Sequence, residues 1–363
     1  DIQLRYTKNA DNGPVDTALV TFVQYWNEKF ISPTLTISSV NQLFSLIEKK
    51  YPHQIPVKTG EISPYWEDGA YSTAREEVAI RQLVKELIAI EKHTPKEDLK
   101  KMNLYPIHRN VVLFHEHTWG AWCSISDPFS PFTKSQWIYK KAFLDSAEKQ
   151  MEQLQRQLPK WSNSTPLLSS DFGIEKIQLD SLSGGLRTIQ LKNGEVLDFN
   201  ETPFWEGVYQ WDINPTQLIR PKCVRHHNIE NQEESITLVQ LQYPNPSSIS
   251  SVSIEYHLHK SNGTLRIITT AEKEPVLTKE SLHFRLSLPA KASQLIYGQS
   301  LLRYPQDQLP GSNREFICSD GEVRVRCPQF QMKVQSPDIN LFEVGGIIDE
   351  NQTKGAKVWD RKV

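Results

Sequence analysis

Hydrophobic positions along residues 1–62 change their period repeatedly. Alternation of apolar and polar residues over 2–6 and over 35–37 predicts two short strands. Helical spacing after each strand predicts two amphipathic helices, the second opened by a capping box of Ser39 and Gln42. Strands that alternate with helices are typical of parallel α/β sheets, so we interpret this region as a β-α-β-α piece of such a sheet, which cannot close a barrel or a sheet by itself.

Residues 63–166 carry longer helical stripes. Thr73 and Glu76 have capping-box spacing and open a predicted helix with a wide apolar face. A second long helix is predicted to start at Thr133 and to end at Pro159, with a shorter helix between the two. This pattern predicts a helical bundle.

From about residue 167 the pattern changes to short alternating runs. Hairpin turn signals separate them at Gly184-Gly185, Asn193-Gly194 and Asn262-Gly263. An antiparallel β-sandwich is therefore predicted over 167–363, with strands over 174–179, 186–191, 236–241, 252–258, 264–268 and 282–288. Because a last strand candidate, 356–359, has no closing turn, we expect the chain to be cut within a domain at both ends.

Composition adds mainly exclusions. The 363 residues include 41 Lys and Arg against 43 Asp and Glu, so no basic excess indicates a nucleic-acid partner. Mean hydropathy is -0.50, and no apolar run approaches the roughly 20 residues of a membrane helix, so no membrane partner is expected. Cys318 and Cys327 flank a predicted hairpin and can pair, although isolated buried thiols are the commoner arrangement. The compartment stays open, with a periplasmic or secreted location favoured.

The first candidate site lies within residues 60–75, where the predicted sheet ends and the first long helix begins. Ligands of α/β folds gather beyond the carboxyl ends of parallel strands. Aromatic faces stack on sugars and carboxylates bind their hydroxyl groups, which makes several residues candidates for substrate binding: Glu61, Tyr65, Trp66, Asp68 and Arg75. The alternative is a helix-capping loop with solvated acids and a buried tryptophan.

The second candidate site lies within residues 111–122. An apolar run there is followed directly by several residues that can bind a metal or a sugar: His115, Glu116, His117 and Trp119. Two histidines at this spacing chelate a metal when both rings point the same way, as on a strand. The spacing is not that of a His-Glu-x-x-His metalloprotease. A structural histidine in the core or at its rim is the alternative.

Taken together, these motifs resemble those of glycoside hydrolase family 38-type α-mannosidases, in a divergent bacterial-type branch. The family's Gly-Asp-Phe-x-x-Tyr segment corresponds to 60–65, with Glu61 in place of Asp, and its Gly-Tyr-Tyr-Thr-Ser-Arg-like segment to 69–75. Its His-His-Asp motif corresponds to 114–120, where Thr118 replaces Asp. Residues 179–194 and 279–284 resemble segments of the family's β-sandwich.

The resemblance implies a retaining glycoside hydrolase acting on α-mannosides. It implies that residues 1–62 are the C-terminal edge of a β/α barrel, followed by the bundle and a galactose-mutarotase-like sandwich. It implies that His117 binds zinc, with His115 as the alternative ligand, and that Glu116 and Trp119 contact the sugar. Asp11 is the implied acid/base candidate. Retaining chemistry uses two carboxyl groups about 5 Å apart.

The family's His-x-Asp-x-Gly-Trp segment, which carries the nucleophile and further zinc ligands, does not occur in this sequence. Because zinc needs about four ligands, we expect no tight zinc binding and no turnover by this chain alone, and a site completed by an N-terminal catalytic segment. Other functions stay open: a non-catalytic carbohydrate-binding or interaction module, or a degenerate relative in which Trp119 and Trp122 are core residues.

Overall fold

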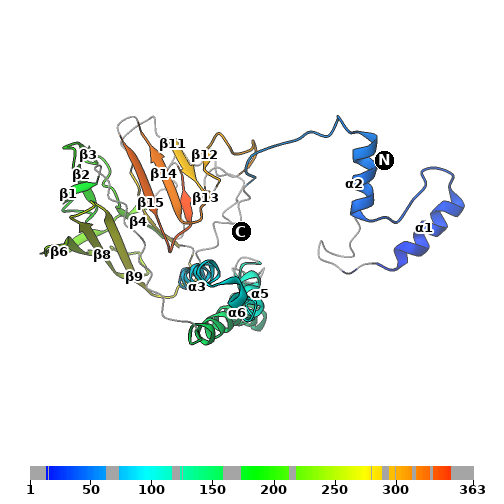
Figure 1. The fold of residues 1–363 in the computed structure, drawn as a ribbon, viewed down its shortest axis with the longest axis horizontal. Helices are drawn as coiled ribbons and strands as arrows, with labels where there is room; N and C mark the ends of the chain where they lie inside the picture. Colours follow the sequence, from blue (N-terminus) through cyan, green and yellow to red (C-terminus); the bar gives the residue numbers. More distant parts are fainter. Residues whose placement is uncertain are drawn as a thin grey trace. The chain divides into compact units, whose positions relative to one another are not determined.

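The computed structural model describes residues 14, 16–62, 73–116, 123–124, 126–157, 173–211, 218–278, 280–287, 294–298, 300–312, 316–327 and 330–344. Two compact units, Asp1–Thr59 and Gly60–Val363, are described separately below. Their helices and strands are labelled in Figure 1. The structure combines helices with several antiparallel sheets, as the sequence predicts at this level.

The described part of the first unit consists of two amphipathic helices, α1 (Ala18–Lys29) and α2 (Val40–Lys50). The predicted capping box of α2 is confirmed, because the Ser39 side chain accepts a hydrogen bond from the Gln42 amide. The strand predicted over 35–37 is wrong. Leu35 bonds through its backbone to the Asn27 side chain instead, and no neighbouring strand is present among the described residues of this unit. The strand predicted over 2–6 lies outside the described residues.

The second unit opens with four helices, α3 (Ala74–His93), α4 (Lys96–Leu99), α5 (Tyr105–His115) and α6 (Pro131–Gln155). The longer helices bury a shared apolar core, formed by Ile80, Leu83, Leu87, Ile90, Ile107, Phe114, Leu144, Ala147, Met151 and Leu154. Each fully buried aliphatic side chain contributes about 1.5–3 kcal/mol. The long, short, long succession predicted for this region is therefore present.

Helix α3 begins where the sequence predicts, but without its capping box, and α6 begins two residues earlier than predicted. Thr73 is the N-cap of α3, but its side chain makes no capping hydrogen bond. Helix α6 begins at Pro131 rather than near Thr133, because Ser130 caps it and proline suits the first helical position. Thr133 is instead buried inside the first turn.

From residue 173 onward the described residues form antiparallel sheets. The first sheets have the order β1-β2-β3, β10-β4-β5 and β6-β7-β8-β9. Their strands are β1 (Ile174–Leu179), β2 (Leu186–Leu191), β3 (Val196–Asp198), β4 (Gly207–Trp211), β5 (Leu218–Ile219), β6 (Lys222–Glu230), β7 (Glu234–Gln242), β8 (Ile249–His259), β9 (Leu265–Lys273) and β10 (Glu280–Phe284).

The remaining sheets have the order β12-β11-β14-β15 and β13-β16. Their strands are β11 (Gln294–Tyr297), β12 (Leu302–Tyr304), β13 (Phe316–Cys318), β14 (Glu322–Arg326), β15 (Gln331–Gln335) and β16 (Leu341–Glu343). The last predicted strand, 356–359, lies outside the described residues. All four cysteines are present as thiols, and Cys318 and Cys327 are not joined by a disulfide.

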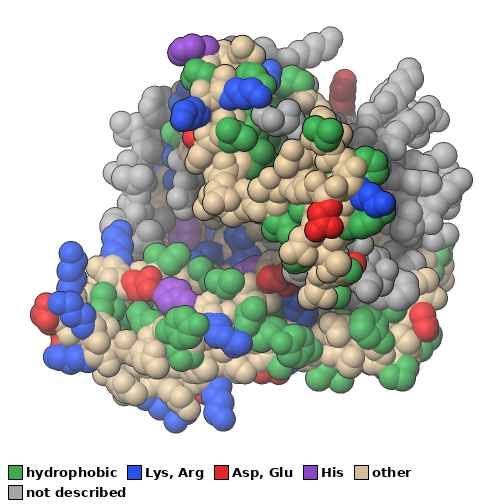
Figure 2. Space-filling view, turned by 90° about the vertical axis from the view of Figure 1, so that its right-hand side faces the viewer, with side chains coloured by type: hydrophobic (Ala, Val, Ile, Leu, Met, Phe, Trp, Pro, Cys, Tyr) green, Lys and Arg blue, Asp and Glu red, His purple; other side chains and the backbone are tan. Residues whose placement is uncertain are grey.

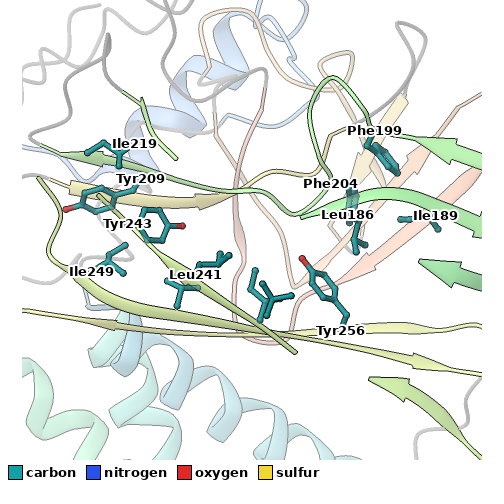
Figure 3. Close-up of a cluster of buried hydrophobic side chains, with 13 residues drawn as sticks. Leu186, Ile189, Phe199, Phe204, Tyr209, Ile219, Leu241, Tyr243, Ile249 and Tyr256 are labelled. Atoms are coloured by element: carbon teal, nitrogen blue, oxygen red, sulfur yellow. The ribbon is translucent and has the colours of Figure 1, made fainter. Parts of the chain in front are cut away.

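The large hydrophobic core of the β region lies between sheets, which gives this region a sandwich-like character (Figure 3). Val252, Ile254 and Tyr256 of β8 contribute to it from one side, and Leu186 and Tyr209 from other sheets. Gly184 has a φ of +73°, and a Cβ there would stand 2.7 Å from the side chains of β7, so glycine is needed at this turn.

Helix α3 also contacts the C-terminal sheets. The Lys85 Nζ donates to the Pro337 carbonyl at 2.5 Å, and the Gln82 amide lies 3.4 Å from the Asp338 carboxylate. No helix within the described ranges is long and apolar enough to span a membrane.

Candidate functional site

The predicted site residues divide into those that the structure describes and those that it does not. Glu61, Arg75, His115 and Glu116 are described. The other candidates lie outside the described residues: Asp11, Tyr65, Trp66, Asp68, His117 and Trp119. The candidate site is therefore built from the described side chains that lie next to the two motif segments in the sequence.

Glu61 lies against the C-terminal sheets. Its backbone amide donates to the Asp307 carbonyl at 2.9 Å, and its carbonyl accepts from the Leu309 amide at 3.0 Å. Its carboxylate accepts hydrogen bonds from the buried Tyr297 hydroxyl and from the Gln308 amide. Burial and the Glu61 carboxylate together raise the pKa of Tyr297. Glu61 therefore anchors the chain just before the first motif segment.

A second group of charged side chains lies where α3 begins and α5 ends. Glu77 and Arg81 are separated by one helical turn, so they share one side of α3. His115 is the last residue of α5, and Lys140 of α6 donates to the Leu113 and Phe114 carbonyls at 3.0 and 3.3 Å. Arg81 acts electrostatically on both Glu77 and His115, which joins the two helices at this end of the bundle.

The protonation states of this cluster are shifted in opposite directions. Burial raises the pKa of the Glu77 carboxyl, and the Arg81 guanidinium counteracts this shift only in part. Burial lowers the pKa of the His115 imidazole, and the nearby charges of Arg81 and Lys140 lower it further. The raised pKa of Glu77 favours the protonated carboxyl and the lowered pKa of His115 favours the neutral imidazole, so the two groups are candidates for proton transfer.

Two polar atoms at the same end of α3 are buried without a hydrogen-bond partner. They are the hydroxyl oxygen of Thr73 and the Nε of Arg81. A buried polar atom of this kind costs stability unless a ligand or a water satisfies it. Thr73 is the N-cap of α3 and Arg81 is its eighth residue, so both atoms lie near the start of this helix.

The remaining predicted residues take different positions. Arg75 is exposed in the first turn of α3, and Glu116 is exposed beyond the end of α5. Glu116 raises the pKa of Lys140 by its charge, although burial lowers that pKa more. Among the predicted residues that are described, His115 is the one on which the Arg81 guanidinium acts electrostatically.

The described residues do not form a zinc site. His115 ends a helix rather than occupying a strand, so its position does not provide the paired rings that two histidines on a strand would offer. Its charged neighbours are Arg81 and Lys140, which repel a divalent cation. No group of three metal-ligating side chains occurs among the described residues. The zinc expectation therefore rests on His117, and no chemical step is derived through zinc.

A cavity of about 440 Å³ lies beside the start of α6, lined by Cys123, Ser126, Asp127, Ser130 and Phe132. The buried Cys123 thiol lies 3.2 Å from the Thr133 hydroxyl, which in turn donates to the Asp127 carbonyl at 2.9 Å. These polar groups satisfy one another, so we interpret them as the support of the helix start.

Sequence reasoning missed Glu77 and Arg81. The available signal was their spacing of four residues, directly after the first motif segment. That spacing is common on solvated helix faces. Only the packing of α5 against this end of the bundle distinguishes Glu77 and Arg81 from an ordinary exposed pair.

No family model, no curated protein and no solved structure matches the chain.

Proposed function

We propose that this chain forms one side of the sugar-binding site of a retaining glycoside hydrolase of the α-mannosidase type. The site lies where α3 begins and α5 ends. The observation that carries the proposal is that both motif segments border this one place. Residues 63–72 lead directly into α3, residues 117–122 follow the end of α5, and Arg81 acts on charged groups of both helices.

Glu77 is the described carboxyl group that best fits a proton donor. Its raised pKa keeps the proton on the carboxyl to a higher pH, as protonation of a glycosidic oxygen requires. The Arg81 Nε and the Thr73 hydroxyl offer hydrogen bonds to sugar hydroxyls. A retaining reaction needs a second carboxyl group about 5 Å away, which an N-terminal catalytic segment supplies in this proposal.

In the same proposal, residues 1–62 belong to the edge of a β/α barrel, and residues 167–363 to a galactose-mutarotase-like sandwich. The exposure of apolar side chains on α1 and α2 supports the first assignment, since helices of a barrel pack such faces onto strands. The antiparallel sheets around a common core support the second. In this proposal His117 is the zinc ligand and Trp119 contacts the sugar.

The binding step is tested on the full chain by following the side-chain ¹⁵N signals of His115 while methyl α-mannoside is added. We expect the His115 signals to shift, and we expect Arg81→Ala to weaken the apparent affinity at least tenfold. Arg109→Ala, on the exposed side of α5, is the matched control and should leave the affinity unchanged. Equal affinity in Arg81→Ala and the unchanged chain would contradict the proposal.

The chemical step is tested in the protein completed by its N-terminal catalytic segment. Glu77→Gln should lower kcat on an aryl α-mannoside by about 10²–10⁴-fold, the usual contribution of general acid catalysis. The loss should be smaller for substrates whose leaving group needs no protonation. An unchanged kcat would exclude Glu77 as the proton donor.

A non-catalytic carbohydrate-binding module is the second candidate function. The unpartnered Thr73 and Arg81 atoms favour it, because they supply hydrogen bonds without requiring chemistry. This alternative predicts that the completed protein binds mannosides through Arg81 and hydrolyses none of them.

A further inference from the structure

Strand β4 of the second unit is buried on both of its faces. Its residues Gly207, Val208, Tyr209 and Gln210 are all buried. The face that carries Tyr209 contributes to the large hydrophobic core, where Figure 3 shows this side chain. Neighbouring residues of a strand point to opposite faces, so Val208 and Gln210 face away from that core.

This second face of the sheet is polar. The Ser281 hydroxyl of β10 donates to the Gln210 side-chain oxygen at 3.0 Å. His283, also on β10, contacts the Glu343 carboxylate of β16 through its Nε2 at 2.8 Å. Because Phe342 packs into the C-terminal core, Glu343 on the same strand faces the opposite way, toward β10.

Charges along this face are balanced. The Glu206 carboxylate, 4% exposed, accepts from Arg220 at 2.5 Å and lies 3.5 Å from Arg285. Arg220 is 51% exposed, so this end of the polar face reaches solvent. The negative charges of Glu206 and Glu343 balance the positive charges of the two arginines. This balance does not favour a strongly charged ligand.

Two polar atoms on this face are buried without a partner, the Nε2 of Gln210 and the Nδ1 of His283. Gln210 is only 1% exposed. In the strand register Ser281 lies opposite Gln210 and His283 lies opposite Val208, so Gln210 and His283 are diagonal neighbours on one face. Native proteins rarely leave such groups unsatisfied.

The chemistry of the two atoms is complementary. A carboxylate only accepts hydrogen bonds, so in the tautomer that fits the Glu343 contact the proton of the His283 ring lies on Nε2 and Nδ1 is an acceptor. The Gln210 Nε2 is a donor. A hydroxyl group accepts one hydrogen bond while donating another, so a single hydroxyl satisfies both atoms.

We propose that this face of the β10-β4-β5 sheet binds a neutral, hydroxyl-bearing small molecule such as a sugar or a polyol, through Gln210 and His283. The site is separate from the Glu77, Arg81 and His115 cluster and does not depend on it. Ser281 positions the Gln210 amide, and Glu343 positions the His283 ring and fixes its tautomer.

The test uses the full chain labelled with ¹⁵N in its histidine side chains. Mannose, glucose, galactose and glycerol are titrated separately, and the Nδ1 and Nε2 signals of His283 are followed. We expect at least one of them to shift the His283 Nδ1 signal with saturation. Gln210→Leu and His283→Gln should each weaken this binding at least tenfold, as measured by ligand-observed NMR.

Arg81→Ala is the control that distinguishes this site from the one at the helical bundle. It should leave the His283 shift unchanged, whereas Gln210→Leu should leave the His115 shift unchanged. The His283 signal of the unaltered chain decides the matter if a variant fails to fold. A His283 signal that none of the four compounds shifts indicates a buried water and overturns the proposal, as does binding that survives both substitutions.

Discussion

The two helices of the first unit and the helices of the bundle have the same kind of amphipathic sequence, yet they differ in what they bury. Neither α1 nor α2 contains a buried residue, and Phe22, Val40 and Phe44 are each at least half exposed. Helix α3 buries Ile80 and Leu87 almost completely. The comparison shows that apolar periodicity is sufficient to predict a helix, whereas burial also requires a facing partner.

The exposed apolar side chains are part of a wider feature of the molecular surface. Figure 2 shows hydrophobic side chains among charged ones on the face that it presents. Scattered apolar residues are normal on protein surfaces, but a helix whose whole apolar stripe is exposed is not. Leucine, tyrosine and glutamate each occur at a buried or half-buried position of the second unit and at an exposed position of the first, so matched substitutions measure the effect of burial.

The largest effect is expected for Leu87→Ala in α3. Leu87 is 2% exposed within the bundle core, and removing its side chain leaves a cavity that costs about 2–5 kcal/mol of unfolding free energy. Chemical denaturation of the full chain, followed by near-ultraviolet circular dichroism, measures the loss. A loss under 1 kcal/mol would mean that the bundle core is not tightly packed.

A smaller effect is expected for Tyr209→Phe in β4. The Tyr209 hydroxyl donates to Glu280 at 2.5 Å and accepts from the Ser248 amide at 3.2 Å. Removing it leaves buried polar groups unsatisfied, at a cost of about 1–3 kcal/mol. Tyr25→Phe in α1, where the tyrosine is 53% exposed, should be neutral in the same denaturation experiment. Equal effects at the two positions would contradict the burial assigned to Tyr209.

Glu77→Gln tests the cluster at the end of the bundle through its pH dependence. Because folding raises the pKa of Glu77 above 4.5, the folded chain binds more protons than the unfolded chain in the window above that pH. Stability therefore falls as the pH rises through this window, and Glu77→Gln removes this loss. Unfolding measured from pH 4 to pH 7 should show the advantage of the variant growing with pH. Glu48→Gln on the exposed side of α2 is the matched control and should change the unfolding free energy by less than about 0.5 kcal/mol.

The smallest effect is expected for Leu46→Ala in α2. Leu46 is 48% exposed in the structure, so its truncation should change the unfolding free energy by less than about 0.5 kcal/mol. Proteolysis within residues 16–59, followed by mass spectrometry, gives a local measure of the same change. A loss comparable to that of Leu87→Ala would show that the apolar stripe of α2 is covered in solution.

Regular local patterns made much of the second unit predictable. The strands over 174–179 and 186–191 agree with the prediction residue by residue, because alternation was clear and the glycines at 184 and 185 marked the turn. The apolar stripe predicted for α6 contains four of its five buried residues, whereas the stripe predicted for α3 contains Leu83 and Leu87 but neither Ile80 nor Ile90. Such features depend on residues close in sequence, so a single sequence contains them.

What depends on distant residues was predicted less well. Leu35 sits in an alternating run, but a strand needs a hydrogen-bonding neighbour that the run itself does not specify. Glu77 and Arg81 look like an ordinary surface pair until α5 is packed beside them. The sequence did not predict that Gln210 and His283 share one face of a sheet, because this face arises from strand pairing across about seventy residues.

The attachment of Glu61 to Tyr297 has a consequence for the order in which contacts form while the chain is synthesised. Its partner Tyr297 lies 236 residues later in the sequence, so the contact cannot form while synthesis is still upstream of that point. At a synthesis rate of about 5–20 residues per second, the segment leading into α3 stays untethered for roughly ten seconds or more. The helical bundle, whose contacts are local, has time to assemble before its entrance is fixed in place.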